Sequence, residues 1–436
     1  MALSTMATAL VFAAAAGLAL YRSPPPPIPM ILVAGLGAMA LLALVVTRYD
    51  LAVGLAFVGL GVVKFEPAPV DLLVATLILV AVATGRVNLR RIPLTAAGAL
   101  AAFLLLNVVS MVDAISPGQA AFFFALTLYG AMLAFWLAGY IDSPRRARMI
   151  VRCYLVAAVG TTVISLLALA VPFPGHEDLI YGADRLQGLF KDPNVYAPFL
   201  VPIALILLEE IITPRLLAVR KSLKGLMLSL LIVGVLLAGS RAAWLSLGLG
   251  VAVLLAVVSL RRGGATRGFA ALAVVAFGLG GATVVVVATG NSSLLGERAE
   301  VQAYDSERFN TQAESINVAQ EHPIGLGPGQ FDVYSPTAVH SLYLRALVEQ
   351  GILGMAAMLA FLVATLVLAL RNAAEGRDTM GIGSAALLGA WIGLLANSVV
   401  IDSMHWRHLW VLTALIWAGY MHRAVRSRAP RSAALT

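Results

Sequence analysis

Long hydrophobic runs, separated by short polar or charged segments, extend along the whole chain. A helix needs roughly 20 mostly apolar residues to cross about 30 Å of hydrocarbon. The pattern predicts 12–14 membrane-spanning helices, two of them short enough to be half-helices or a re-entrant pair (51–63 and 70–84). The segments lie near 4–20, 28–46, 51–63, 70–84, 97–112, 119–140, 149–171, 194–213, 223–239, 241–260, 268–290, 343–370, 381–401 and 406–424. Because 4–20 lacks a basic start and a cleavage site, we interpret it as the first span.

The composition agrees with a membrane protein. Hydrophobic residues make up 60% of the chain and charged residues 12%, whereas soluble domains average about 45–50% and about 25%. This excludes an ordinary soluble, disordered or disulfide-rich secreted protein. The single cysteine, Cys153, allows no internal disulfide. The expected fold class is therefore an all-α polytopic membrane protein.

The net charge of +8 reflects membrane topology rather than nucleic-acid binding. Most of the 30 lysines and arginines fall in alternate loops, and cytoplasmic loops carry the basic excess in membrane proteins. Both termini are therefore predicted to be cytoplasmic. Arg185, Lys191, Arg241, Arg308 and Arg345 are among the few basic residues placed outside. No basic stripe is interleaved with aromatic residues, so we expect no nucleic-acid partner.

Two outer segments, 172–193 and 291–342, are too long to be simple connectors. They predict a division into helices over 1–290 with an outer loop at 172–193, a periplasmic loop domain at 291–342, and helices with a cytoplasmic tail over 343–436. The second segment is expected to contain an amphipathic helix, capped by Asp305 or Ser306 and ended by Pro323. A turn-rich stretch follows at 325–329.

Three outer positions are candidates for chemistry. Arg185 and Lys191 lie close to a helix start that Asp192 or Asn194 can cap, and such a start with an arginine suits an anion such as phosphate. The alternative is an interfacial arginine beside an ordinary cap. Arg241 lies between two apolar runs, where an arginine costs about 2.5–3.5 kcal/mol. This cost favours a functional role over interfacial placement.

Histidines mark two further candidates. His340 ends the second long segment, and a neutral histidine can act as a general base; a capping or hydrogen-bonding role is the alternative. Asp402, His405 and His408 lie between the last two predicted helices. The i, i+3 spacing of the histidines permits a metal, but an interfacial polar cluster is the favoured interpretation, so no metal site is predicted.

Several motifs are missing from the sequence. It contains no nucleotide-phosphate loop, no Asp-x-Asp and no Gly-x-Ser-x-Gly. These absences disfavour an ATP-driven pump and a nucleotide-sugar enzyme. Acidic residues are few within the predicted spans, which disfavours a proton-coupled transporter.

Four segments occur in the order of a known set of family motifs. They are Arg-Leu-Gln-Gly-Leu-Phe-Lys-Asp-Pro-Asn at 185–194, Gly-Ser-Arg at 239–241, His-Pro-Ile-Gly-Leu-Gly-Pro-Gly at 322–329, and His-Ser-Leu-Tyr-Leu-Arg at 340–345 with Glu349. Together they resemble motifs of the O-antigen ligase and polymerase superfamily, over about residues 180–420. Ala242 replaces the usual glycine and Ser341 the usual asparagine.

The resemblance implies a fold like that of the C-type glycosyltransferases and a glycan donor on undecaprenyl diphosphate. Arg185 and Arg241 would bind the diphosphate, and His340 would take the proton of an acceptor hydroxyl that attacks with inversion. Lys191, Arg345, Asn194 and Tyr343 are secondary candidates. No metal or nucleotide cofactor is implied.

The sequence thus predicts an O-antigen ligase-type enzyme of the bacterial inner membrane. It would move a glycan en bloc to an acceptor such as the lipid A-core at the periplasmic face. Two alternatives stay open: a polymerase that uses the same donor, and a lipid-linked glycan transporter. A transporter needs polar groups at mid-membrane depth, whereas the polar residues here gather on one side.

Overall fold

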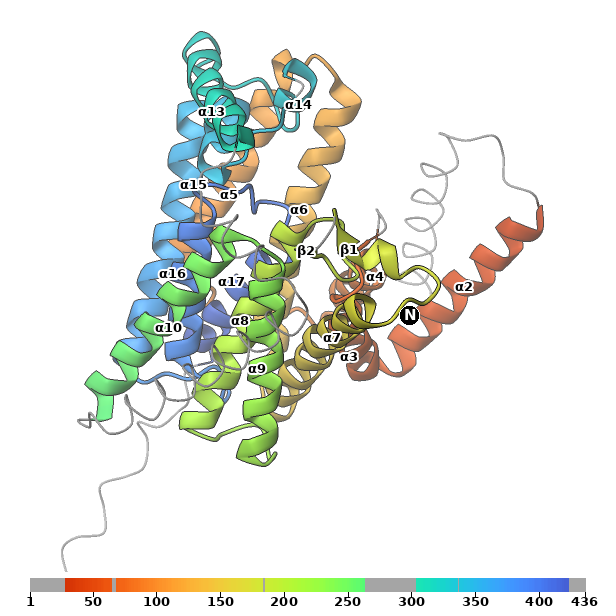
Figure 1. Cartoon of the computed structure of the whole chain (residues 1–436). Helices are drawn as coiled ribbons and strands as arrows, with labels where there is room; N and C mark the ends of the chain where they lie inside the picture. Colours follow the sequence, from red (N-terminus) through yellow and green to blue (C-terminus); the bar gives the residue numbers. More distant parts are fainter. Residues whose placement is uncertain (1–27, 65–67, 183–184, 263–302, 336, 423–436) are drawn as a thin grey trace, which may run out of the picture.

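A computed structural model describes residues 28–64, 68–182, 185–262, 303–335 and 337–422. They form a bundle of helices with a single two-stranded antiparallel sheet (Figure 1). The helices are α2 (Ile28–Thr47), α3 (Tyr49–Gly59), α4 (Pro69–Ala83), α5 (Leu94–Ser110), α6 (Pro117–Tyr140), α7 (Pro144–Ala170), α8 (Pro193–Ile212), α9 (Lys221–Leu237), α10 (Arg241–Arg262), α13 (Ala303–Glu321), α14 (Phe331–Tyr334), α15 (Leu342–Ala374), α16 (Ser384–Asn397) and α17 (Arg407–Met421). The 3₁₀ helices are η1 (Met111–Asp113) and η2 (His176–Leu179), and the strands are β1 (Ile180–Tyr181) and β2 (Arg185–Leu186).

The all-α class predicted from the hydrophobic pattern is confirmed. Each predicted apolar segment within the described residues forms a helix, whereas 4–20 and 268–290 lie outside them. Six of the described helices are long and apolar enough to cross a membrane, namely α5 extended through η1, α6, α7, α8, α10 and α15. The expected short pair is observed as α3 and α4, with 11 and 15 residues.

Most helix boundaries follow the expected local signals. Prolines occupy the first positions of α4, α6, α7 and α8, where the missing N–H would have no intrahelical partner. Asp192 caps α8 by accepting a hydrogen bond from the Asn194 amide at 2.7 Å. The predicted cap of α13 is wrong, because the helix already includes Asp305 and Ser306. Acidic residues are favourable in the first turn of a helix as well as at its cap. An aspartate in the sequence therefore locates a helix start only to within one turn. Pro323 follows the end of α13, as predicted.

The helices pack closely where small residues face one another. Gly389 and Gly393 on α16 lie four residues apart, opposite Ser246 and Gly250 on α10. A Cβ atom on either α16 glycine would overlap a carbonyl oxygen of α10. Such small-residue pairs let membrane helices approach closely, where dispersion contacts replace the hydrophobic effect.

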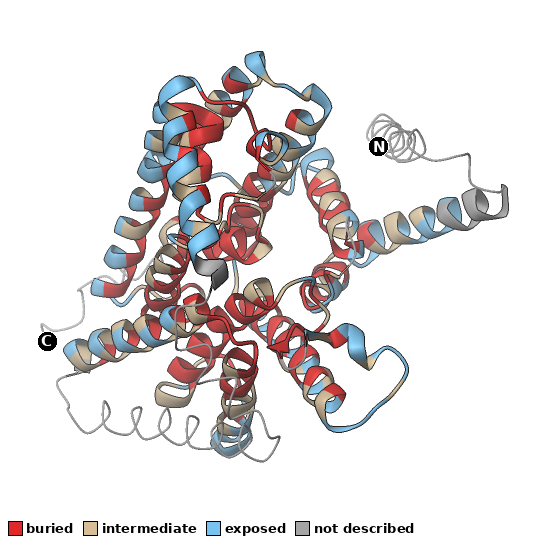
Figure 2. Cartoon of the chain, turned by 45° about the horizontal axis from the view of Figure 1, so that its top comes forward, coloured by how far each residue is buried: buried red, intermediate tan, exposed pale blue. Residues whose placement is uncertain are grey.

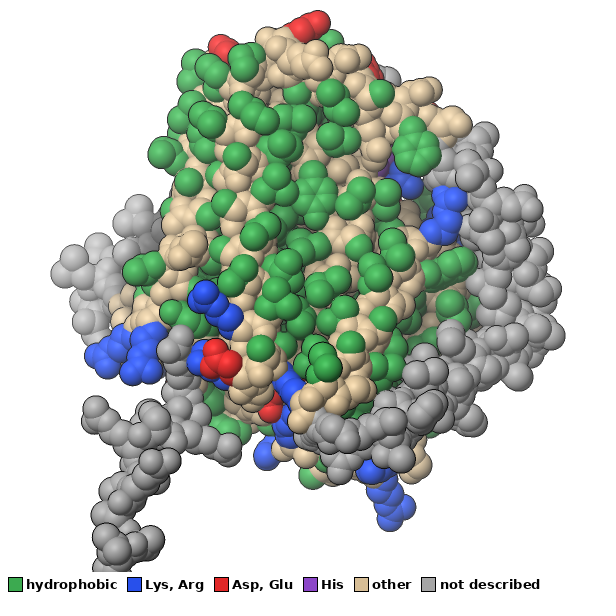
Figure 3. All heavy atoms as spheres, turned by 90° about the vertical axis from the view of Figure 1, so that its left-hand side faces the viewer, with side chains coloured by type: hydrophobic (Ala, Val, Ile, Leu, Met, Phe, Trp, Pro, Cys, Tyr) green, Lys and Arg blue, Asp and Glu red, His purple; other side chains and the backbone are tan. Residues whose placement is uncertain are grey.

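The surface is that of a multi-pass membrane protein. Buried residues face neighbouring helices, whereas α2 projects outward and packs against α3 and α4 (Figure 2). Hydrophobic side chains cover the middle of the face in Figure 3, and lysines and arginines gather near its lower end. Large apolar side chains such as Leu105 on α5 and Leu353 on α15 are 64% and 67% exposed. An apolar belt of this kind suits lipid and not water.

A glycine-rich loop and a helix kink fit together at the upper end of the bundle. Gly351 has φ 71° and ψ −177°, a conformation open to glycine alone, and it breaks α15. Loop 322–329 lies against this break, where the amides of Leu326 and Gly327 donate to the carbonyls of Val348 and Glu349 at 3.0 and 2.8 Å. A Cβ atom on Gly351 would overlap the carbonyl of Pro323. The kink therefore fixes the loop.

We expect Gly351→Ala to lower the free energy of unfolding by about 1–3 kcal/mol from backbone strain alone, and further through the clash. Gly98→Ala is the matched control, because Gly98 lies inside α5 and an added Cβ meets no atom within 4 Å. Thermal unfolding of the purified protein in detergent measures both. Equal unfolding temperatures for the two variants would contradict this account of the kink.

Candidate functional site

A polar cavity of about 250 Å³ lies where α8, α10, α13 and the segment before α17 meet. Its polar lining residues come from segments far apart in the sequence: Asn194, Arg241, Arg308 and Gln312. The apolar lining consists of Gly239, Ala242, Leu245, Phe309, Val400 and Ile401. Two of the four sequence motifs thus contribute to one cavity, and we name it the arginine cavity.

Arg185 reaches the wall of the arginine cavity from the β1–β2 sheet. It pairs with Tyr181 in that sheet, and its guanidinium group lies 5.6 Å from the centre of the Tyr181 ring. Its Nε donates to the carbonyl of Ala238 at 2.9 Å, and an Nη donates to Oδ1 of Asn194 at 3.4 Å. These bonds connect the ends of α8 and α9, and Arg185 is only 7% exposed.

Arg241 is the first residue of α10, directly after a tight turn. Gly239 permits the turn through its φ of 61°. The free N–H groups at a helix start carry a partial positive charge, which adds to that of the arginine. The neighbouring Ser240 hydroxyl is buried and has no hydrogen-bond partner in the described part of the chain. This end of α10 therefore suits an anionic ligand.

Arg308 and Gln312 complete the arginine cavity and were missed as site residues by the sequence analysis. They lie four residues apart on α13, hence on one face of the helix. An Nη of Arg308 donates to the carbonyl of Val400 at 3.1 Å, and Nε2 of Gln312 donates to the carbonyl of His340 at 3.1 Å. The only available signal was the presence of Arg308 among the few basic residues placed outside.

His340 lies between the long loop and α15, with its backbone held by Gln312. The imidazole makes no hydrogen bond with the described residues, and it is half-buried. Burial lowers the pKa of His340 most, and the positive charges of Arg308 and Arg345 lower it further, against the opposing effects of Asp192 and Asp402. The ring is therefore neutral at pH 7 and can accept a proton. The adjacent Ser341 caps α15, because its hydroxyl accepts from the Leu344 amide.

Arg345 is committed to carboxylates rather than to the arginine cavity. Its guanidinium group contacts Asp332 at 3.0 Å, Glu349 at 2.8 Å and Asp402 at 2.8 Å, and the side chain is 5% exposed. Glu349 also accepts a hydrogen bond from the Gly329 amide at 2.8 Å. We call these four charged residues the Arg345 cluster. It joins α14, α15, the glycine-rich loop and the segment before α17.

The remaining candidates lie in different surroundings. The Tyr343 hydroxyl donates to the carbonyl of Leu395 at 2.8 Å, and Lys191 lines a second cavity beside the first. Nε2 of His405 lies 3.2 Å from the Thr127 hydroxyl, whereas the His408 ring lies tilted against Trp406 with 4.9 Å between the ring centres. Within the described residues, no group of three His, Cys, Asp or Glu side chains is arranged to hold a metal ion.

The fold and the cavity define a multi-pass membrane protein with a polar site at one end of its helices. Residues 226–359 match the model of a family described as O-antigen ligase, so this part of the chain is similar to that family. The match includes Arg241, Arg308, His340 and Arg345. It supports a glycan-transferring enzyme of the ligase or polymerase kind. No curated protein matches the chain.

We expect Arg345→Met to destabilise the protein by roughly 3–5 kcal/mol, because three carboxylates would lose the buried cation that they share. Arg371→Met is the matched control, since Arg371 lies in the last turn of the same helix, where it is exposed. Urea or thermal unfolding in detergent gives the measurement. An unfolding temperature equal to that of the wild type would contradict a structural role for Arg345.

Proposed function

We propose that the protein transfers a glycan en bloc from undecaprenyl diphosphate to an acceptor sugar at the periplasmic face of the bacterial inner membrane. The observation that carries this proposal is the arginine cavity, where Arg241 and Arg308 face the same space and Gln312 holds the backbone of His340. The backbone of the candidate base is thus tied to a residue that lines the cavity of the cations.

The cations suit a diphosphate leaving group. Arg241, Arg308 and the start of α10 supply positive charge, and Arg185 orients Asn194 at the wall of the cavity. Arginine hydrogen bonds to phosphate are charge-assisted and frequently bidentate. Charge develops on the diphosphate as the glycosidic bond breaks, and preorganised cations stabilise that charge most in the transition state.

An apolar groove beside Arg241 suits the lipid part of the donor. The groove has a volume of about 510 Å³ and lies between α8, α9 and α10. It is lined by Ala204, Leu205, Leu208, Leu228, Ile232, Leu236, Trp244, Leu247, Gly248, Val251, Ala252 and Leu255. Trp244 is three residues after Arg241, so a prenyl chain in the groove would begin where its diphosphate is bound. This juxtaposition of charge and apolar surface favours a lipid-linked donor.

His340 would act as the general base. It takes the proton of an acceptor hydroxyl, whose oxygen attacks the anomeric carbon of the donor. The bond from that carbon to the diphosphate oxygen breaks, and its electron pair leaves with undecaprenyl diphosphate. Attack opposite the leaving group inverts the anomeric configuration.

Charge distribution supports a periplasmic site. Most of the basic side chains visible in Figure 3 gather near the lower end of the bundle, whereas α13 and α14 lie at the upper end in Figure 1. Cytoplasmic loops carry the excess of lysine and arginine. The upper end and both cavities would then be periplasmic, and both termini cytoplasmic.

We expect His340→Gln to lower the transfer rate by about 10²–10⁴-fold, as for the loss of a general base. The purified protein receives undecaprenyl-diphosphate-linked glycan with EDTA, plus either lipid A-core or a second lipid-linked glycan, and product is followed on gels. Product on lipid A-core identifies a ligase, and a ladder of longer lipid-linked chains identifies a polymerase.

His176→Gln is the matched control for this assay, because His176 lies in η2 and does not line the arginine cavity. Binding of the donor is measured separately and should survive in His340→Gln. Wild-type turnover by His340→Gln would exclude the proposed base. Absence of product from the wild type with both acceptors would overturn the transferase.

The lowered pKa of His340 predicts the pH dependence of transfer. Protonation removes the base, so activity is full at neutral pH and falls as the pH drops through the pKa of His340. Because burial, Arg308 and Arg345 lower that pKa, the midpoint of the acid limb should lie below the ordinary histidine value of about 6.5. Arg308→Gln removes a positive charge and should move the midpoint to higher pH. A pH profile of kcat/KM for the acceptor at saturating donor checks both, and a midpoint above 6.5 in the wild type would contradict the assignment.

A further inference from the structure

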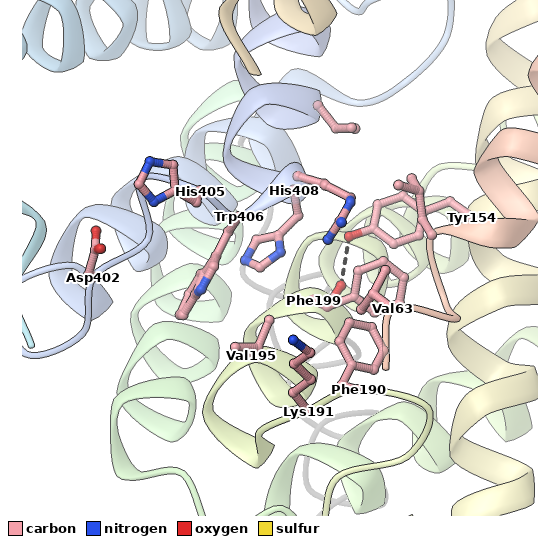
Figure 4. Close-up of a pocket in the computed structure, with 13 residues that line it drawn as sticks. Val63, Tyr154, Phe190, Lys191, Val195, Phe199, Asp402, His405, Trp406 and His408 are labelled. Carbon is pink, nitrogen blue, oxygen red and sulfur yellow. Dashed lines mark hydrogen bonds between the residues drawn. The ribbon is translucent and has the colours of Figure 1, made fainter. Parts of the chain in front are cut away.

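Figure 4 shows a second cavity, of about 230 Å³. Asn194 lines the first cavity and Val195 the second, and side chains of consecutive helical residues project about 100° apart. Likewise Ile401 lines the first and Asp402 the second. The two cavities therefore lie on different sides of the same two segments. We call the second one the aromatic cavity.

The aromatic cavity contains a polar atom without a partner. Nε2 of His408 makes no hydrogen bond with any described residue, although His408 is only 4% exposed. Buried polar atoms are nearly always paired, so this nitrogen suits a hydrogen bond with a ligand in the cavity. In Figure 4 the Lys191 side chain, from the segment before α8, points toward the His408 ring.

The walls of the aromatic cavity are mainly apolar, and three charged residues, Lys191, Asp402 and Arg407, also line it. Phe190, Phe199 and Trp406 supply ring surfaces. Arg407 binds both carboxylate oxygens of Asp71, and Asp402 belongs to the Arg345 cluster. Aromatic surface with a few hydrogen-bonding side chains suits a sugar ring, whose C–H face packs on rings while its hydroxyls pair with polar side chains. The volume equals that of roughly eight waters, which suits one ring rather than an oligosaccharide.

We propose that the aromatic cavity binds the sugar ring of the acceptor that receives the glycan. This inference rests on the proposed function. Inversion places the attacking hydroxyl and the diphosphate on opposite sides of the anomeric carbon, and the first cavity is the one lined by Arg241 and Arg308. The charges that act on His340 come from both cavities, Arg308 from the first and Asp402 from the second. His340 lines neither cavity, and we expect it to act between them, on a hydroxyl held in the aromatic cavity.

The test is His408→Phe, which keeps a planar ring and removes Nε2. The KM for the acceptor should rise about tenfold, as for the loss of one hydrogen bond, while kcat and the KM for the donor stay within twofold. The unfolding temperature should not fall, because the variant removes a buried unpaired polar atom. Loss of stability with loss of kcat would indicate a merely structural histidine and would overturn the proposal. His176→Phe is the control.

Other results are equally decisive. A raised KM for the donor with an unchanged KM for the acceptor would assign the aromatic cavity to the donor glycan and contradict the proposal, as would no change in either KM. If the wild type forms no product, the proposed function is wrong, but the inference about the aromatic cavity can still be tested. Binding of delipidated core oligosaccharide, measured by calorimetry, then decides the inference separately: binding weakened by His408→Phe supports a sugar site, and no binding overturns it.

Discussion

The ion pairs of Arg345 are the interaction on which the arrangement of the site depends. One guanidinium group contacts Asp332 after the glycine-rich loop, Glu349 one turn further along α15, and Asp402 before α17. Removal of one partner from a buried ion pair costs about 3–5 kcal/mol, so these segments are held firmly. His340 lies five residues before Arg345, and the segment of Asp402 borders both cavities. The cluster thus fixes the candidate base relative to the places where ligands would bind.

Two cavities with different chemistry lie on either side of the start of α8. The arginine cavity combines Arg241 and Arg308 with the start of α10, and an apolar groove begins one turn along that helix. The aromatic cavity combines ring surfaces with the unpaired nitrogen of His408. An anionic lipid and a neutral sugar would therefore meet from different sides, which is the geometry that an inverting displacement requires.

The sequence predicts the helices well, because membrane spans need long apolar runs and alternative structures leave backbone groups unpaired in lipid. It also singles out Arg241, because a cation at an apolar boundary is costly. It does not single out Arg308 or Gln312, since both are ordinary residues on a polar helix. From the sequence alone, Arg345 looks like a further phosphate ligand. Its partners Asp332 and Asp402 are distant in the sequence and become its neighbours only when the chain folds. The kink at Gly351 is equally hidden, since a glycine within an apolar run has many roles.

A structure of the protein with undecaprenyl-diphosphate-linked glycan bound tests the central claim most directly. We expect density for the two phosphates beside the guanidinium groups of Arg241 and Arg308, with the first sugar between the two cavities and facing His340. The chain offers a clear alternative location, because Arg48, Arg86 and Arg146 line a larger cavity of about 630 Å³ among α3, α6 and the segment after α4. Phosphate density in that cavity, with the arginine cavity empty, would contradict the account.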